Sequence, residues 1–403
     1  MISPTQTLRV CHLLPSTLTQ DGPSNVLLSL LQNLRQTSIE SSVWSMYAPP
    51  KDRCPSAAIL ATGAKYRELG MSQSFLDPRV LPPLVASLRQ AKPDVLQCHL
   101  VRASLYGRIA AAIAGIPCVI CVAHSVEEYM TSDNLRDRLV RRAESATQSM
   151  VTRYVAVSDA VSHALRNRVG ISPERICTIR NGISLGGSSA GTSEARREAR
   201  ARMGLSIDDL VVGTVARLLP RKRQHDLLRS IAALSHHVAH LKCVIVGDGE
   251  ARPKLESLVK ELQLESAVTL LGHRPDVSEL LPGFDVFALT SSHEGLPVAL
   301  LEAMRAGLPA VVTRAGGIAE AVADGDSGFV VEIADVPGLA AALNTLLLDG
   351  ELRQRFGASS RRRADQMFSA EAMAATYADL YTRVAKERLK QAVNSSTMDT
   401  VRE

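Results

Sequence analysis

Four charged side chains stand at spacings that suit the binding of an anion with hydroxyl groups on either side. Glu294 and Glu302 lie within the stretch TSSHEGLPVALLEAMRAGLPAVVTRAGG, which begins at Thr290. In a helix this spacing corresponds to roughly 12 Å along the axis, and carboxylates accept hydrogen bonds from hydroxyl groups. Arg217 and Lys222 directly follow a predicted strand. A guanidinium and an ammonium in that position can neutralise a diphosphate, so the four residues predict a diphosphate site.

The sequence around the two glutamates indicates how a helix would position them. Pro297 is suited to the first helical position, and Gly307 followed by Pro309 ends the helix. The helix then begins just beyond the predicted strand Val286–Leu289, where its unpaired N–H groups attract phosphate. A nucleotide sugar has hydroxyls at both ends of its diphosphate and fits this arrangement. The alternative is that Glu302 is a solvated helix residue, Glu294 a helix cap, and the two basic residues ordinary surface groups.

The elements that position these residues alternate between short apolar runs and longer helical patterns, which is typical of parallel sheets covered by helices. A chain of 403 residues exceeds the roughly 250–300 residues that one core serves, so two domains are expected. We predict an α/β protein with two Rossmann-like domains whose parallel sheets face each other across a cleft. The predicted strands are Leu8–Leu14, Ser42–Met46, Val95–His99, Cys118–Ala123, Tyr154–Ser158, Ile176–Ile179, Val211–Ala216, Lys242–Val246, Val268–Leu271, Val286–Leu289, Ala310–Thr313 and Gly328–Val331.

The domain boundaries follow from composition. The first domain covers residues 1–185, a linker rich in glycine and serine covers 186–195, and the second domain covers 196–369. A helix over 370–391 has an apolar stripe that requires a surface, and we expect it to cross back to the first domain. Residues 392–403 are polar and predict a frayed tail.

Composition excludes several classes of protein. Aromatic residues make up only 3% of the chain, which argues against a surface that stacks nucleic-acid bases. The start of the chain lacks the features of a signal peptide, and no apolar stretch is long enough to span a membrane. The seven cysteines lie mostly in apolar runs, which indicates a reducing, cytoplasmic setting. Cys118 and Cys121 are an odd offset apart in a strand and should point to opposite faces, so we expect no metal site there.

Basic residues gather in three segments, 136–142, 196–202 and 361–363, in a chain of net charge +5. Solvated helix faces explain such clusters most simply. For the first cluster the alternative is peripheral docking at the inner face of a membrane that carries a lipid-linked acceptor.

The motifs together resemble those of retaining glycosyltransferases of family 4, which have the GT-B fold. Glu294 and Glu302 match the family's E-x7-E motif, and Arg217 and Lys222 match its R-x4-K motif. The turn Gly247-Asp248-Gly249 and the segment that begins YVAVSDAVSHAL at Tyr154 are also similar. The resemblance covers about residues 8–385 and is strongest from Tyr154 to Gly328.

The resemblance implies roles for the residues of the second domain. Glu302 would bind the ribose hydroxyls, Glu294 the donor-sugar hydroxyls, and Arg217 and Lys222 the diphosphate. The backbone N–H groups of Gly295, Leu296 and Val298 would also bind the diphosphate, whereas Pro297 has no N–H group. Three further loops would line the same site, and they contribute Gly247, then His273 and Arg274 towards the nucleobase, and Gly316.

In the first domain the resemblance implies a close backbone approach at Gly22 and a histidine on the acceptor side of the donor sugar. His124 ends a predicted strand and matches that histidine, and His99 also ends a strand and is the second candidate. The family's Gly-Gly turn is replaced here by Asp21-Gly22-Pro23, which permits one close backbone approach, at Gly22. A strand-end histidine with only a structural role is the alternative for His124.

The implied reaction transfers a sugar from a UDP- or GDP-sugar to a glycan or lipid-linked acceptor, as in surface polysaccharide or glycolipid assembly. The configuration at the anomeric carbon would be retained, and the diphosphate itself would receive the acceptor's proton. The basic side chains replace a divalent cation, and no Asp-x-Asp triplet stands at the end of a predicted strand, so we expect neither a metal nor another cofactor. Two alternatives share the fold: a nucleotide-sugar epimerase and a nucleotide-sugar-binding protein without turnover.

Overall fold

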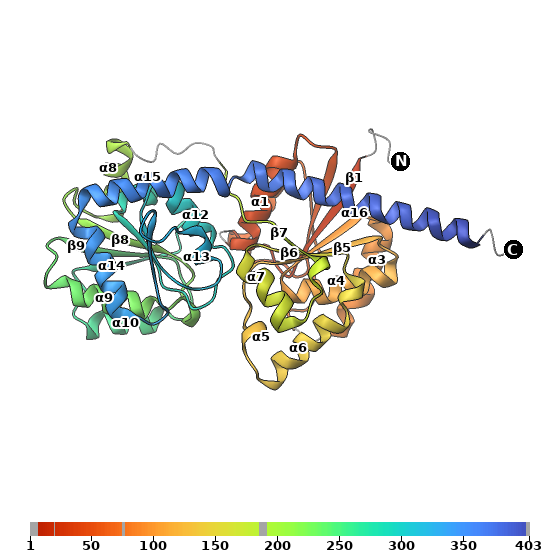
Figure 1. Cartoon of the computed structure of the whole chain (residues 1–403), viewed down its shortest axis with the longest axis horizontal. Helices are drawn as coiled ribbons and strands as arrows, with labels where there is room; N and C mark the ends of the chain where they lie inside the picture. Colours follow the sequence, from red (N-terminus) through yellow and green to blue (C-terminus); the bar gives the residue numbers. More distant parts are fainter. Residues whose placement is uncertain (1–6, 20, 75–76, 185–191, 400–403) are drawn as a thin grey trace. The chain divides into compact units, whose positions relative to one another are not determined.

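The chain forms two compact units, each built around its own parallel sheet (Figure 1). The computed structural model describes residues 7–19, 21–74, 77–184 and 192–399. Unit 1 consists of residues 1–182 together with 370–403, and unit 2 of residues 183–369. The two-sheet α/β architecture that the sequence predicts is confirmed.

Unit 1 contains a sheet of seven parallel strands in the order β3-β2-β1-β4-β5-β6-β7. The strands are β1 Leu8–Leu14, β2 Ile39–Ser45, β3 Lys65–Glu68, β4 Val95–His99, β5 Cys118–Ala123, β6 Arg153–Ala156 and β7 Ile176–Thr178. The helices are α1 Gly22–Leu34, α2 Ser56–Ala61, α3 Leu81–Ala91, α4 Leu100–Ala114, α5 Glu128–Thr131, α6 Leu135–Ala146, α7 Asp159–Ala164 and α16 Ala370–Asp399. Strand order reverses between β1 and β4, the point at which sheets of this kind bind ligands.

Helices cover both faces of this sheet because alternate side chains of a buried strand point to opposite sides. Cys98 of β4 points towards α4, where a Cβ at Gly107 would lie 2.4 Å from its Sγ. On the other face Gln97 of β4 accepts a hydrogen bond from Tyr381 of α16. Cys118 of β5 also meets α16, through the carbonyl of Val384.

Unit 2 repeats the plan with six parallel strands in the order β10-β9-β8-β11-β12-β13. The strands are β8 Leu210–Val215, β9 Leu241–Val246, β10 Val268–Gly272, β11 Val286–Leu289, β12 Ala310–Thr313 and β13 Gly328–Val331. The helices are α8 Ser193–Met203, α9 Gln224–Ser235, α10 Arg252–Glu261, α11 Val277–Leu280, α12 Val298–Arg305, α13 Ile318–Ala321, α14 Val336–Leu348 and α15 Gly350–Met367, and a 3-10 turn covers Pro220–Lys222. Here the order reverses between β8 and β11.

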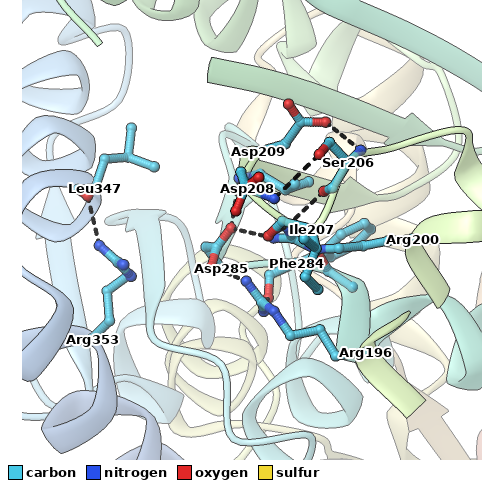
Figure 2. Close-up of polar contacts among 12 residues, drawn as sticks. Arg196, Arg200, Ser206, Ile207, Asp208, Asp209, Phe284, Asp285, Leu347 and Arg353 are labelled. Atoms are coloured by element: carbon cyan, nitrogen blue, oxygen red, sulfur yellow. Dashed lines mark hydrogen bonds and ion pairs between the residues drawn. The ribbon is translucent and has the colours of Figure 1, made fainter. Parts of the chain in front are cut away.

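Two arginines of the second basic cluster, residues 196–202, have a structural role, which corrects the simplest interpretation of its sequence for Arg196 and Arg200, whereas Arg197 and Arg202 are exposed as expected. Arg200 of α8 is 1% exposed and donates to the carboxylate of Asp285 at 2.8 Å (Figure 2). Arg196 donates to the other carboxylate oxygen at 2.6 Å. Asp285 also accepts the N–H of Val211 at 2.7 Å. Two guanidinium groups on one carboxylate therefore anchor α8 at the start of β8 and β11.

The strand positions follow the sequence predictions closely, and three elements differ. β3 was not predicted, because its sequence KYRE lacks an apolar run; it is an edge strand with little burial. Helix α16 continues to Asp399, beyond residue 391, and no glycine or proline interrupts it. Helix α8 begins at Ser193, inside the segment 186–195, because Thr192 caps it by accepting the N–H of Ala195. Residues 186–191 of the predicted linker lie outside the described residues.

The seven cysteines are free thiols. Cys121 hydrogen-bonds with Cys98 on the α4 face, whereas Cys118 meets α16 on the other face. The predicted opposite orientation of the CxxC pair is therefore confirmed.

Candidate functional site

Five loops of unit 2 carry the candidate residues, and all five follow strands of one parallel sheet. Arg217 and Lys222 follow β8, Gly247 follows β9, His273 and Arg274 follow β10, Glu294 follows β11, and Gly316 follows β12. Since all of these strands are parallel, the loops lie at the same edge of the sheet. The β8 and β11 loops flank the point at which strand order reverses, the expected ligand position in such a sheet.

Direct side-chain contacts join the β8 and β11 loops. The ammonium of Lys222 forms an ion pair with Oε1 of Glu294, and both side chains are largely buried, at 13% and 10% exposed. Ser291 donates a hydrogen bond to the same oxygen at 2.7 Å. The Thr290 hydroxyl donates to the carbonyl of Lys222 at 2.9 Å. Two of the four charged residues therefore converge, and their loops are held in fixed register.

Oε2 of Glu294 has no hydrogen-bond partner among the described residues, since both donors bind Oε1. A carboxylate oxygen can accept further hydrogen bonds. Glu294 is thus held in place through one oxygen and offers the other.

Glycines allow the neighbouring loops to approach this pair closely. A Cβ at Gly316, where φ is +54°, would lie 2.0 Å from the carbonyl oxygen of Glu294. A Cβ at Gly247, where φ is +135°, would lie 1.9 Å from the carbonyl oxygen of Ala216, next to Arg217. Only glycine combines these backbone conformations with such contacts. The β12 loop therefore packs on Glu294, and the β9 loop packs on the backbone that carries Arg217.

The start of α12 is open. Pro297 precedes the helix in an extended conformation, and no side chain caps the helix by a hydrogen bond. Pro297 is thus the cap residue rather than the first helical residue, and the helix begins at Val298. Gly295 and Leu296, which connect Glu294 to the helix, are buried. An uncapped helix start carries a partial positive charge and unpaired N–H groups, which favour an anion.

Glu302 lies within α12, and its carboxylate has no hydrogen bond or ion pair with any described residue. Burial raises the pKa of Glu302 from 4.5 to about 7. A carboxylate in such surroundings is costly unless a partner satisfies it. Its chemistry fits a ligand with hydroxyl donors.

The other three basic residues that the sequence predicts for this site differ in their availability to a ligand. The Arg217 side chain is exposed and has no ion-pair partner among the described residues, so it can bind an anion. Arg274 instead forms a two-pronged ion pair with Asp276, at 2.8 and 2.5 Å, which raises the pKa of Arg274. His273 is exposed. The structure therefore places His273 and Arg274 in the expected loop after β10, and Asp276 already neutralises the charge of Arg274.

Gly22 and His124 belong to unit 1. Gly22 begins α1 after β1, and a Cβ there would meet nothing within 4 Å, so the backbone is open to a ligand. His124 follows β5, and its Nε2 lies 2.8 Å from Nδ1 of His99. The two candidate histidines of the sequence are thus in direct contact.

Sequence reasoning missed the residues that support these side chains. Ser291 lies three residues before Glu294 and donates a hydrogen bond to it. Gln97 binds His99 of the histidine pair, and Tyr381 in turn binds Gln97. For Ser291, the available signal was its position in the TSSHEG segment, close to Glu294. For Gln97, it was the position two residues before His99, which places both side chains on the same face of a strand.

The described residues also bear on metal binding and on membrane crossing. No group of three or more histidine, cysteine, aspartate or glutamate residues is positioned to bind a metal ion there. None of the described helices combines the length and the apolarity that crossing a bilayer requires.

Family models match both halves of the chain. The model of "Glycosyl transferases group 1" matches residues 195–363, and that of "Glycosyltransferase Family 4" matches residues 20–186. Among curated relatives, an Escherichia coli UDP-Gal:alpha-D-GlcNAc-diphosphoundecaprenol alpha-1,3-galactosyltransferase is 28% identical over 270 residues, which are 66% of this chain and 70% of the relative. A lipopolysaccharide core biosynthesis glycosyltransferase of Rhizobium meliloti is 29% identical over 79% of this chain and 84% of the relative.

Solved structures share the fold. Anabaena HepE in complex with UDP and glucose superposes with a TM-score of 0.80 at 22% identity, over 93% of this chain and 100% of that one. Sucrose-phosphate synthase of Thermosynechococcus elongatus gives 0.79 at 18% identity, over 93% and 99%. The two matched family models and the twin parallel sheets lead to one conclusion, that this chain belongs to the family 4 glycosyltransferases of GT-B fold.

Proposed function

We propose that this glycosyltransferase takes a sugar from a nucleoside diphosphate, with uridine as the first candidate base, and transfers it with retention to a glycan or lipid-linked acceptor of surface polysaccharide or glycolipid assembly. The observation that carries the proposal is the Lys222–Glu294 ion pair at the switch point of the unit 2 sheet. A relative whose name specifies UDP-Gal and a diphosphoundecaprenol acceptor supports the choice of donor and acceptor.

The available atoms of unit 2 match the parts of such a donor. Arg217 has an unpaired guanidinium for the diphosphate, and the uncapped start of α12 offers N–H groups to it. Glu294 retains one oxygen for a sugar hydroxyl, and Glu302 has both oxygens for the ribose. Lys222 is already within reach of Glu294, so it can contact both the phosphate and the carboxylate.

The chemistry that follows is electrostatic. As the bond between the sugar and the diphosphate breaks, negative charge grows on the leaving phosphate oxygen, and Arg217 and Lys222 stabilise it. The acceptor hydroxyl attacks on the face that the diphosphate leaves and passes its proton to the diphosphate. Neither glutamate acts as a nucleophile or a general acid, in contrast to the carboxylate pairs of glycoside hydrolases.

Protection against thermal unfolding tests donor binding. We expect UDP or a UDP-sugar to raise the unfolding temperature of the full chain, and GDP to do so less. Glu302→Ala should abolish the protection, while Glu261→Ala, a change at the end of α10, should keep it. Equal protection of wild type and Glu302→Ala would remove the ribose assignment.

Product analysis tests the reaction. With a donor identified by protection, NMR of the product should show the anomeric configuration of the donor retained. Conversion of the donor sugar without any acceptor would instead indicate an epimerase, and binding without turnover a binding protein. Activity should persist in excess EDTA, because we propose that Arg217 and Lys222 take the place of a metal ion; loss of activity that Mg²⁺ restores would contradict this.

We also propose that the enzyme works in the cytoplasm and contacts the membrane through α6. Leu135 and Leu139 of this helix are 70% and 54% exposed, and Arg138 and Arg142 are exposed beside them. Apolar and basic side chains on one helix surface suit an anionic bilayer. Sedimentation with vesicles of phosphatidylglycerol and phosphatidylcholine should capture wild type, and Leu135→Ser/Leu139→Ser should reduce capture; equal capture would refute the contact.

A further inference from the structure

A chain of hydrogen bonds in unit 1 leads from helix α16 to His124. Gln97 and His99 occupy alternate positions of β4 and therefore share one face of the sheet, the face that α16 covers. Tyr381 of α16 contacts Gln97, Gln97 contacts His99, and His99 contacts His124. Tyr381, Gln97 and His99 are almost completely buried, at 0%, 0% and 2% exposed, so water does not compete for these bonds.

The chemistry of the groups fixes the direction of this chain. The Tyr381 hydroxyl donates to Oε1 of Gln97 at 2.6 Å, which leaves the amide nitrogen facing His99. An amide nitrogen only donates, so Nε2 of His99, 3.2 Å away, must be the acceptor. A neutral imidazole has one N–H, which for His99 is then on Nδ1. That group donates to Nε2 of His124 at 2.8 Å.

Both histidines are neutral at ordinary pH. Burial, with the neighbouring His124 and His12, lowers the pKa of His99 well below 6.5, and burial lowers the pKa of His124 to about 4. His12 of β1 lies behind them, with its ring 5.9 Å from that of His99 and 6.4 Å from that of Tyr381. Burial lowers the pKa of His12 to about 3, so it adds no charge beside the chain of bonds.

His124 must then carry its proton on Nδ1, because its Nε2 accepts the bond from His99. Nδ1 of His124 has no partner among the described residues, and the side chain is partly exposed. Nδ1–H is thus the group that His124 can offer to a ligand.

We propose that Tyr381, Gln97 and His99 are positioning residues that hold His124 as a neutral hydrogen-bond donor through Nδ1–H. His124 then binds a substrate oxygen and does not remove the acceptor's proton through Nε2. The inference rests on the proposed function, in which the diphosphate takes the acceptor's proton and no side chain is needed as a base. Helix α16, from the far end of the sequence, thereby sets the protonation of a residue at the end of β5.

The tautomer of His124 is measurable without substrate, so this test is independent of the proposed function. In ¹⁵N-histidine-labelled full-length protein, His124→Gln identifies the His124 signals. We expect the pattern of a neutral ring protonated on Nδ1, with Nε2 accepting a hydrogen bond. A ring protonated on Nε2, or a mixture of tautomers in wild type, overturns the inference and leaves the proposed function standing.

Substitutions separate positioning from simple packing. Tyr381→Phe removes one hydroxyl and should allow the Gln97 amide to turn, giving mixed tautomers of His124 and a kcat about threefold to tenfold lower, the effect of one hydrogen bond. Tyr377→Phe is the matched control, since Tyr377 is also buried in α16, its ring lies 5.8 Å from that of Tyr381, and it lies outside the chain of bonds. The control should keep both the tautomer and kcat. Equal effects of the two variants would show a packing role only and refute the inference.

The conservative variant at His99 gives the sharpest comparison. His99→Asn can still present an amide N–H at the δ position to His124, whereas His99→Leu cannot. Asn should preserve the Nδ1–H tautomer of His124 and most of kcat, and Leu should lose both, with unchanged affinity for UDP in each case because the donor residues lie in unit 2. If Asn and Leu behave alike although both fold, as circular dichroism would establish, the positioning role is refuted.

Discussion

Replacement of Glu302 by glutamine should make the ligand-free protein more stable at alkaline pH while it abolishes nucleotide binding. Glu302 has no partner among the described residues, and burial raises its pKa from 4.5 to about 7. The pKa of Glu302 is higher in the folded state than in the unfolded state. Its carboxyl group therefore does not lower the free energy of unfolding below about pH 4.5, and it lowers that free energy increasingly as the pH rises towards 7. Above pH 7 the cost is complete.

The pKa difference sets the size of the effect. At roughly 1.4 kcal/mol for each pKa unit, ionisation of Glu302 costs at most about 3.5 kcal/mol of stability above pH 7. Because the side chain is partly exposed, we expect about 1–3 kcal/mol. Glutamine has nearly the same shape and no charge. The free energy of unfolding of Glu302→Gln should therefore exceed that of wild type by this amount at pH 8.5, and by far less at pH 4.5.

Urea unfolding of the full chain at the two pH values measures the difference, with fluorescence and circular dichroism followed together to establish whether the two units unfold separately. Added UDP should reverse the order at pH 8.5, because only wild type has a carboxylate to accept the ribose hydroxyls. Glu261→Gln, at the end of α10, is the control and should show neither effect. A ligand-free Glu302→Gln that is less stable than wild type at pH 8.5 would refute the reasoning.

Three further predictions follow from single contacts. Gly316→Ala should weaken UDP binding, measured by calorimetry, by more than tenfold, because its Cβ would lie 2.0 Å from the carbonyl oxygen of Glu294. Gly325→Ala is the control and should not weaken binding, since Gly325 also has a positive φ but open space around it. Equal affinities of the two variants would refute the close approach. Arg200→Met should cost unit 2 about 3–5 kcal/mol in urea unfolding by leaving Asp285 buried with only Arg196, and Arg200→Met/Asp285→Asn should recover part of that cost. Burial lowers the pKa of His12 from 6.5 to about 3, so the contribution of neutral His12 to stability is complete above pH 6.5 and is lost as the pH falls towards 3. Over that range the free energy of unfolding of wild type should fall by up to roughly 1.4 kcal/mol per pH unit more than that of His12→Leu. Parallel pH profiles of the two proteins would contradict this.

Local patterns were sufficient to predict most of the sheet and the loops that carry the site. β11 and β12 are short apolar runs bounded by turn residues, and the structure has them at the predicted residues. The charged residues at the ends of β8 and β11 could be placed at one edge because parallel strands present their carboxyl ends together. Such inferences need only the order of residues along the chain.

Contacts between distant segments could not be predicted in the same way. Lys222 and Glu294 are 72 residues apart, and their ion pair depends on the strand order β8-β11, which local patterns do not specify. The burial of Arg200 depends on Asp285, which is 85 residues away and pairs with it. The same holds for Tyr381 and Gln97, since only the packing of α16 on β4 brings them together.

The most direct test of the account compares the affinities of UDP and uridine for wild type and for Arg217→Gln by calorimetry. If the guanidinium of Arg217 binds the diphosphate, the variant should bind UDP at least about tenfold more weakly, the value of one charge-assisted hydrogen bond, and bind uridine as wild type does. Unchanged UDP affinity, or an equal loss for both ligands, would contradict a diphosphate site at this edge of the sheet.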